Sequence, residues 1–226
     1  MTLRAITRAE SRQIDRLAVQ QYGLAGVVLM ENAGRGVADR LEKLGIPGPV
    51  VVCCGTGNNA GDGFVIARHL ELRGYAVRVL VWAAAEQLSG DAGVNFQVLA
   101  KTDVPLVLFG KGHDPARLDE ALTGAAWIVD ALLGTGARGE PRAPLDAVIE
   151  RLNASGVPKL AVDLPSGLDC DTGEAARHTI RAAHTCTFIA PKIGFLVPGV
   201  EQYTGEVHVL DIGAPGKLLR DVLGDA

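Results

Sequence analysis

Short apolar runs alternate along most of the chain with longer segments in which apolar residues recur at helical spacing. Apolar runs of this length are typical of buried strands, and the longer amphipathic segments are typical of helices that cover a sheet. The pattern predicts strands at 49–54, 76–82, 104–108, 126–130 and 158–163, and helices at 63–73, 89–101, 114–123 and 142–153. The expected fold class is α/β, a three-layer αβα sandwich with a mostly parallel central sheet.

Two helices are expected ahead of the first strand. Thr7 and Glu10 have the spacing of a capping box, which predicts a helix that starts there and ends at Gly23. The second helix stops at Gly45 and carries one apolar stripe, Met30, Ala33, Val37, Leu41 and Leu44. The tail adds strand-like runs at 184–189 and 206–211 and a short helix after Pro215. With no linker or repeat in the sequence, we expect residues 1–226 to form a single domain.

Composition and charge narrow the function classes. The chain has 226 residues, 48% of them hydrophobic and 21% charged, as in ordinary globular proteins. Its net charge of −4 argues against a nucleic-acid-binding surface, which should be basic. The polar start lacks the apolar core of a signal peptide, and no apolar run is long enough to cross a bilayer. The four cysteines form no CxxC pair, so we expect a protein of the reducing cytoplasm with no membrane partner.

A glycine-rich segment follows the first predicted strand. Gly55–Gly63 is expected to be a loop between that strand and a helix over 64–72, an arrangement that presents backbone N–H groups to a phosphate. Its G-x-G-x-x-A pattern matches the dinucleotide fingerprint, but that match alone is weak. The fingerprint also needs an acidic residue at the end of the second strand, and the first one here is Glu86. A conventional nicotinamide dehydrogenase is therefore disfavoured.

Three strands end in loops rich in glycine and oxygen donors: Gly55–Gly63, Asp130–Glu140 and Asp163–Asp169. Ligands of open α/β sheets bind at the carboxyl ends of the strands, so the three loops predict one composite site. Each residue also has a structural alternative, since acidic residues cap backbone and serine after proline is common in turns. The paired amides Asn58 and Asn59 are the hardest to explain by structure alone.

Asn59, Asp130 and Ser166 offer an amide oxygen, a carboxylate and a hydroxyl, one from each loop. Such hard oxygen ligands suit a hard cation. One carboxylate is little charge for a divalent ion, which makes a monovalent ion plausible. Spacing alone leaves this interpretation open.

Several motifs in order resemble one known family, the YjeF-type N-terminal domains, or NAD(P)H-hydrate epimerases. The motifs are Tyr22-Gly23, Leu29–Gly34, GTGNNAGDGFVIARHL from Gly55, Asp130–Glu140, Val162–Gly167 and Ala190–Lys192. The resemblance implies a Rossmann-like fold and a homodimer, for which the two N-terminal helices are candidate surfaces. It also implies one K⁺ per subunit, held by Asn59, Asp130 and Ser166.

The implied activity is repair of damaged cofactor. Hydrated NADH or NADPH (NAD(P)HX) carries a hydroxyl at C6 of the nicotinamide ring and exists as R and S epimers. The family interconverts the epimers for a dehydratase that accepts only S. The dehydratase domain has no room in this chain, so we expect a separate protein. The resemblance places substrate contacts on Asn58, Asn59, Ala60, Gly61, Asp62, Gly134, Thr135, Gly136, Ala137, Arg138, Gly139, Glu140 and Asp163.

Four points follow from this resemblance as expectations. Asp163 is the expected catalytic group, giving and taking a proton at the C6 oxygen. Lys192 could bind phosphate or close the site, or could equally be a solvated surface lysine. Ala60 stands where the family usually has glycine, which is harmless if its φ is negative. Arg138 suits a 2′-phosphate and Glu140 opposes one, so the preference between NADHX and NADPHX stays open.

The alternative function is a non-catalytic binding or scaffold module of the same fold. Such a descendant should have lost the oxygen donors of the three loops, and this chain retains them.

Overall fold

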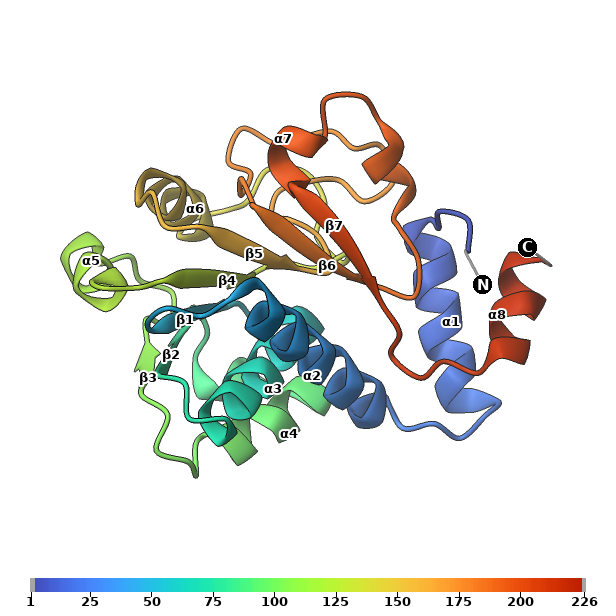
Figure 1. The fold of residues 1–226 in the computed structure, drawn as a ribbon, viewed down its shortest axis with the longest axis horizontal. Helices are drawn as coiled ribbons and strands as arrows, with labels where there is room; N and C mark the ends of the chain where they lie inside the picture. The colour runs from blue at the N-terminus through green and yellow to red at the C-terminus, as the bar shows by residue number, and fades with distance from the viewer. Residues whose placement is uncertain (1–2, 225–226) are drawn as a thin grey trace.

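A seven-stranded, entirely parallel sheet forms the centre of the protein, as seen in a computed structural model that describes residues 3–224 (Figure 1). The strand order is β3-β2-β1-β4-β5-β6-β7, so the direction of winding reverses between β1 and β4. The strands are β1 (Val50–Cys54), β2 (Val77–Val81), β3 (Leu106–Leu108), β4 (Trp127–Ala131), β5 (Lys159–Val162), β6 (His184–Phe188) and β7 (Glu206–Leu210). Each strand expected from the sequence is present.

Helices cover both faces of this sheet, as expected. Alternate β1 residues face opposite ways: Val50 and Val52 join one apolar core, whereas Val51 and Cys53 join another. The first core packs under α2 (Gly26–Leu44), α3 (Asn58–Leu72) and α4 (Gly90–Leu99), and the second under α5 (Pro115–Leu122) and α6 (Leu145–Ala154). The three-layer α/β fold is thereby confirmed.

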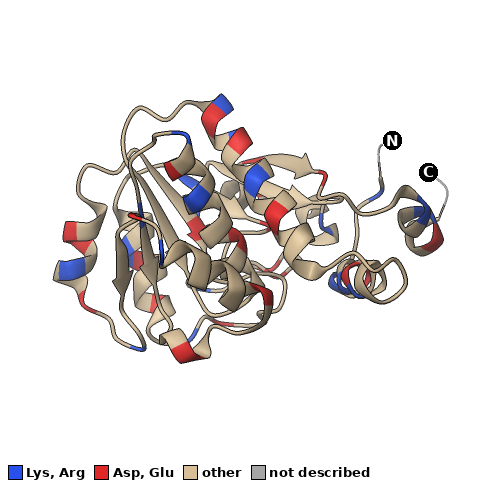
Figure 2. Ribbon diagram, turned by 90° about the horizontal axis from the view of Figure 1, so that it is seen from below, with Lys and Arg blue, Asp and Glu red and all other residues tan. Residues whose placement is uncertain are grey.

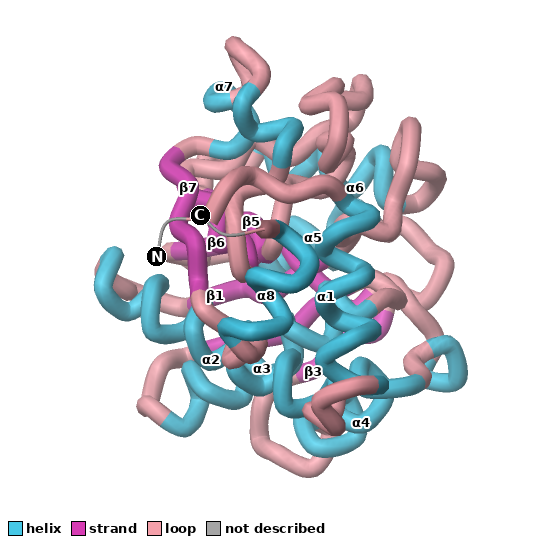
Figure 3. The backbone as a smooth tube through the Cα atoms, turned by 90° about the vertical axis from the view of Figure 1, so that its right-hand side faces the viewer, coloured by secondary structure: helices cyan, strands magenta, loops and turns pink. Residues whose placement is uncertain are grey.

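The two ends of the described chain form a separate helical pair. Helix α1 (Arg8–Gln20) lies beside α8 (Gly216–Leu223), at the β7 side of the sheet (Figures 1 and 3). The capping box predicted for α1 is present, with Thr7 accepting from the Glu10 backbone N–H and Glu10 accepting from the Thr7 N–H. A third apolar cluster, which includes Ile14 and Leu218, holds the pair together. The short helices η1 (Ala85–Gln87), η2 (Ile193–Leu196) and α7 (Glu201–Thr204) were not expected from the sequence.

The prediction of a loop over Gly55–Gly63 is wrong in its second half. Helix α3 begins at Asn58, with Gly57 as its N-cap, so residues 58–63 are its first turns. The glycines serve close packing there: a Cβ at Gly61 would lie 2.5 Å from the Met30 sulfur, and one at Gly63 2.7 Å from the Cys54 sulfur. Tertiary packing therefore overrides the low helix propensity of glycine.

Helix α6 also differs from its predicted range, because it begins at Leu145 and not at residue 142. Pro141 and Pro144 occupy the segment ahead of it, and the latter follows a cis peptide bond. Neither proline can donate a backbone hydrogen bond.

Charged residues of both signs are interspersed over the helices, without a face of one sign (Figure 2). All four cysteines are free and buried, which suits their expected role as small apolar residues. No helix within the described residues has both the length and the apolar character that a membrane crossing requires.

Two glycines of α2 provide a matched test of this packing. A Cβ at Gly34 would lie 2.5 Å from Val65 and 2.9 Å from the Asp62 carbonyl oxygen, whereas one at Gly36 would first meet Leu210 at 3.4 Å. We expect Gly34→Ala to lower the free energy of unfolding by about 1–3 kcal/mol through overpacking. Gly36→Ala should raise it by up to about 1 kcal/mol through helix propensity. Urea denaturation of both variants checks the pair, and equal effects would contradict a close α2–α3 contact.

Candidate functional site

A cavity of about 690 Å³ opens where the direction of winding reverses, at the carboxyl ends of β1 and β4. This is the position at which open α/β sheets bind ligands. The loops after β1, β4 and β5 all contribute to its lining, as the sequence predicted, and α1, α2 and α4 close it from the side.

The N-terminus of α3 forms one wall. Thr56, Gly57 and Asn58 line the cavity, and the Gly57 N-cap has no side chain to occupy the free N–H groups of the first turn. Those groups and the helix dipole favour an anion. Asn59 and Asp62 also line the cavity.

Two of the expected substrate contacts lie behind this wall. Ala60 is fully buried, and Gly61 packs against Met30 and Ala92. Ala60 lies within α3 and does not have a positive φ, so alanine replaces the family's glycine there without backbone strain.

The expected contacts of the second loop are divided between two hollows. Gly134, Thr135, Gly136 and Ala137 line the main cavity, with Ala137 and Gly134 shared by an adjoining pocket of about 290 Å³. Arg138, Gly139 and Glu140 line that smaller pocket. The Glu140 carboxylate accepts hydrogen bonds from the backbone N–H groups of Arg177 and His178, which anchors this loop to the segment between β5 and β6.

The three candidate cation ligands meet around the backbone of Leu133. The Ser166 hydroxyl donates to Asp130 Oδ1 at 2.6 Å and accepts from the Leu133 N–H at 2.9 Å. Asn59 Nδ2 donates to the Leu133 carbonyl oxygen at 3.1 Å. An amide, a carboxylate, a hydroxyl and a carbonyl thus converge in one place.

Asp130 is fully buried and forms no ion pair with any residue from 3 to 224. Desolvation raises the pKa of Asp130 to about 6, and hydrogen bonds from Ser166 oppose that rise. A buried carboxylate without a cationic partner is costly. The donor set therefore fits a cation of low charge.

Asp163 follows β5 and lies in the left-handed region with φ 66°. Its Oδ1 lies 2.8 Å from the Lys192 ammonium, whose side chain is only 1% exposed. Of the sequence alternatives for Lys192, the solvated lysine is wrong, because the side chain is buried in this ion pair. Binding phosphate and closing the site stay predictions. Thr187 also donates to Asp163 Oδ1, at 3.3 Å.

Two further carboxyl groups lie near Asp163. Burial and the charges of Asp163 and Asp15 raise the pKa of Asp62 well above its usual value. Asp15 is exposed, yet desolvation by the neighbouring protein together with the charge of Asp163 raises the pKa of Asp15 to about 6. The cavity thus combines an ion-paired carboxylate with carboxyl groups that hold their protons more tightly than usual.

Sequence reasoning missed the contribution of α1. Arg12, Asp15, Arg16 and Val19 line the cavity, and the Arg12 guanidinium lies beside Gly136. Their spacing of three and four residues places them on one face of a helix, a signal visible in the sequence. The sequence did not show that α1 lies beside this cavity.

Comparison with known proteins agrees with this geometry. Residues 26–194 match the family model described as the YjeF-related protein N-terminus. The chain belongs to this family. The match spans the α3 wall, all three loops and Lys192.

Other members of the YjeF-related family resemble the chain over most of its length. Proteins named NAD(P)H-hydrate epimerase from Rhodopirellula baltica and Pirellula staleyi are each 44% identical over 97% of this chain, and the match covers 88% and 96% of their own lengths. A bifunctional NAD(P)H-hydrate repair enzyme Nnr from Moorella thermoacetica is 42% identical over 95% of this chain, which spans only 41% of that protein. The crystal structure of the yeast protein ynu0 has a TM-score of 0.82 at 26% identity, covering 97% of this chain and 93% of its own.

The opposite environments of Asp62 and Asp163 predict opposite effects of removing their charge. Because the Asp62 pKa is raised in the folded state, the charged form destabilises folding above the unfolded pKa of 3.8. Asp62→Asn should therefore be more stable than the wild type at pH 7, with the gain shrinking to nothing as the pH falls to about 4. Asp163→Asn should lower the free energy of unfolding by about 3–5 kcal/mol, since it leaves the Lys192 ammonium buried and unpaired.

Urea denaturation between pH 4 and 8 checks both variants. Asp103→Asn, at an exposed loop position, serves as the control. Its free energy of unfolding should stay within about 0.5 kcal/mol of the wild-type value. A destabilised Asp62→Asn at pH 7 would contradict the pKa direction given for Asp62.

Proposed function

We propose that the protein interconverts the R and S epimers of hydrated NADH or NADPH at C6 of the nicotinamide ring. The observation that carries the proposal is the Asp163–Lys192 ion pair in the wall of a cavity whose other wall is the N-terminus of a helix. The carboxylate suits proton transfer, and the helix N-terminus suits a phosphate. The names of the relatives from R. baltica and P. staleyi support the same reaction.

The chemistry needs a proton donor and a proton acceptor at one oxygen. Protonation of the C6 hydroxyl allows it to leave as water and gives a ring cation stabilised by N1. Water then adds to either face of C6 and returns a proton to the protein. Opening of the C6–N1 bond is the other route, and it also moves a proton at this oxygen. Asp163 is the proposed proton-transfer group, Lys192 positions its carboxylate, and Asp62, with its raised pKa, can supply a proton.

The phosphates of the substrate would bind at the N-terminus of α3. Its free N–H groups and the side chains of Arg12 and Arg16 line the same space. These groups can donate hydrogen bonds to a pyrophosphate.

The reaction assigns a specific role to Asp163. With purified R-hydrate of NADPH as substrate, the wild type should form the S epimer until the two epimers reach equilibrium. Asp163→Asn keeps the shape and the left-handed backbone preference of the residue. At a temperature where circular dichroism shows the variant folded, it should bind substrate but lose at least about 100-fold in rate, the usual scale of general acid–base catalysis. Chromatographic separation of the epimers measures exchange, and equilibrium dialysis measures binding.

Asp103→Asn should exchange the epimers at the wild-type rate. Full activity in Asp163→Asn would remove Asp163 from the mechanism. Binding without exchange by the wild type would instead favour the non-catalytic module, which the retained oxygen donors disfavour.

We further propose that Asn59, Asp130 and Ser166 hold one potassium ion per subunit. The fit rests on the buried, unpaired Asp130 carboxylate and on the convergence of neutral oxygen donors around Leu133. The ion would supply a positive charge that offsets Asp130 and joins the three loops.

The proposed ion site predicts a cation-specific effect on stability. At constant ionic strength, replacing Li⁺ by K⁺ should raise the melting temperature of the wild type, because a ligand that binds only the folded state stabilises it. Asp130→Asn should abolish this response, and Asp103→Asn should retain it. An equal response in Asp130→Asn would place the ion elsewhere, and a wild type indifferent to K⁺ would refute the site.

Three further proposals accompany this function. The bifunctional relatives are named as repair enzymes and are more than twice as long as the match, which supports a dehydratase that acts after this reaction. A homodimer is proposed on family grounds, and a cytoplasmic location on the free cysteines of the chain.

A further inference from the structure

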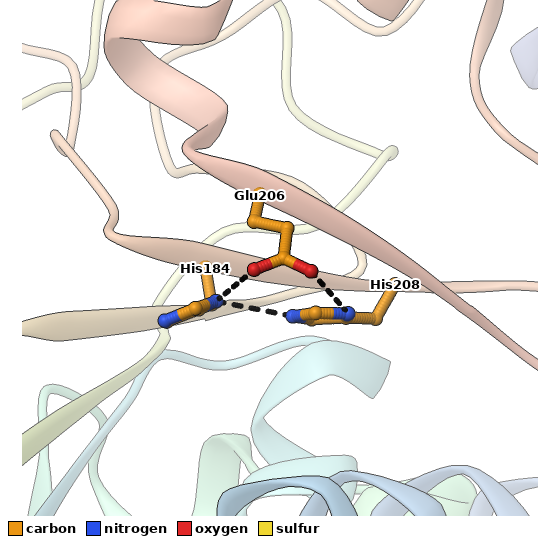
Figure 4. Close-up of side chains that lie close together, drawn as sticks. All are labelled: His184, Glu206 and His208. Atoms are coloured by element: carbon orange, nitrogen blue, oxygen red, sulfur yellow. Dashed lines mark hydrogen bonds and ion pairs between the residues drawn. The ribbon is translucent and has the colours of Figure 1, made fainter. Parts of the chain in front are cut away.

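Two histidines and a glutamate meet on the last two strands of the sheet (Figure 4). His184 begins β6, and Glu206 and His208 lie on β7. The strand register pairs His184 with Glu206 and Cys186 with His208, so the three side chains share one face of the sheet. None of these three residues lines the main cavity or the smaller pocket of the candidate site.

The ligand atoms lie at the separations that a small metal ion requires. His184 Nδ1 lies 3.0 Å from His208 Nε2 and 3.6 Å from Glu206 Oε2, and one donor atom of each residue lies within 4.8 Å of the other two. Tetrahedral zinc with bonds of 2.0–2.1 Å places its ligand atoms about 3.3 Å apart. The two separations at His184 fall on either side of that value, and the third, between Glu206 and His208, is within 4.8 Å.

The residue types suit a metal ion. A neutral imidazole has a lone pair available for a metal, and each histidine presents one ring nitrogen to this cluster. The two imidazole rings are nearly parallel, with centroids 5.2 Å apart, and their facing nitrogens form a 3.0 Å hydrogen bond that a bound metal ion would replace. Glu206 is largely exposed, which leaves the fourth coordination position open to water.

We propose that His184, Glu206 and His208 bind one Zn²⁺ or a similar transition-metal dication. Imidazole and carboxylate ligands suit the divalent ions of this series, and Zn²⁺ accepts three protein ligands with one water. The ion would join the edge strand β7 to β6, at the end of the sheet opposite the cavity.

The charge balance makes this a site of moderate affinity. Arg40 of α2 acts on His208 with a positive charge, and among residues 3–224 Glu206 is the one carboxylate that pairs with both rings. Removing the Arg40 charge should therefore strengthen metal binding, whereas removing the Glu206 charge should weaken it.

Zinc titration of the untagged, metal-stripped protein tests the proposal. Isothermal titration calorimetry should give one Zn²⁺ per chain. His184→Ala and His208→Ala should abolish this binding, and Glu206→Gln, at an exposed position, should weaken it at least about tenfold, the scale on which even outer ligands act. Arg40→Gln should lower the Kd.

The matched control is His113→Ala, which removes an exposed histidine far along the chain from the cluster. It should bind Zn²⁺ as the wild type does, and the buried cysteines offer no competing exposed thiol. Zn²⁺ should also raise the melting temperature of the wild type and of His113→Ala, but not that of His184→Ala.

The outcomes separate the proposal from its alternatives. No stoichiometric binding by the wild type, or binding unchanged in both Glu206→Gln and His184→Ala, would overturn it. Circular dichroism shows whether His208→Ala, at a buried position, is folded, and the exposed Glu206→Gln keeps the test decisive if it is not.

Discussion

The Asp163–Lys192 ion pair is the interaction on which the site depends. An ammonium group that is 1% exposed requires a charged partner, and Asp163 supplies it at 2.8 Å. The Lys192 ammonium also donates to the Phe188 carbonyl oxygen at 3.2 Å, and the Lys192 backbone forms a β-bridge with Ile6. One buried charge thus joins the ends of β5 and β6 to the segment that precedes α1.

Backbone strain collects around the same point. Of the described residues other than glycine, Asp163 and Ile189 have positive φ, at 66° and 70°. Both follow neighbouring strands, and both line the cavity. A β-branched residue in this region is unfavourable, and such strain persists only where surrounding contacts impose it. The ion pair and the strand ends provide those contacts, so the shape of the cavity is held by the fold around it.

The sequence predicted the sheet, its order of elements and the three loops, because strand and helix periodicities are local properties. It also predicted that Asn59, Asp130 and Ser166 would meet, because parallel strands place their carboxyl ends together. Prediction from the sequence failed where long-range packing determines the local structure. The helical state of Asn58–Gly63 depends on the close approach of α2 and β1, and the partner of Lys192 depends on a left-handed turn after β5. The contribution of Asp15 required the position of α1, which no local pattern contains.

The position of α1 also has a consequence for the order in which the protein folds. Arg8 is buried, its guanidinium contacts Asp169 at 2.8 Å, and its N–H donates to Asp171 at 2.7 Å. These contacts close loops of more than 160 residues, as does the Ile6–Lys192 bridge. Loop closure over such distances has a high entropic cost and follows the formation of local contacts. Helix α1 is therefore among the last to dock, although it is synthesised before the sheet, and the cavity exists only once the final strands have been synthesised.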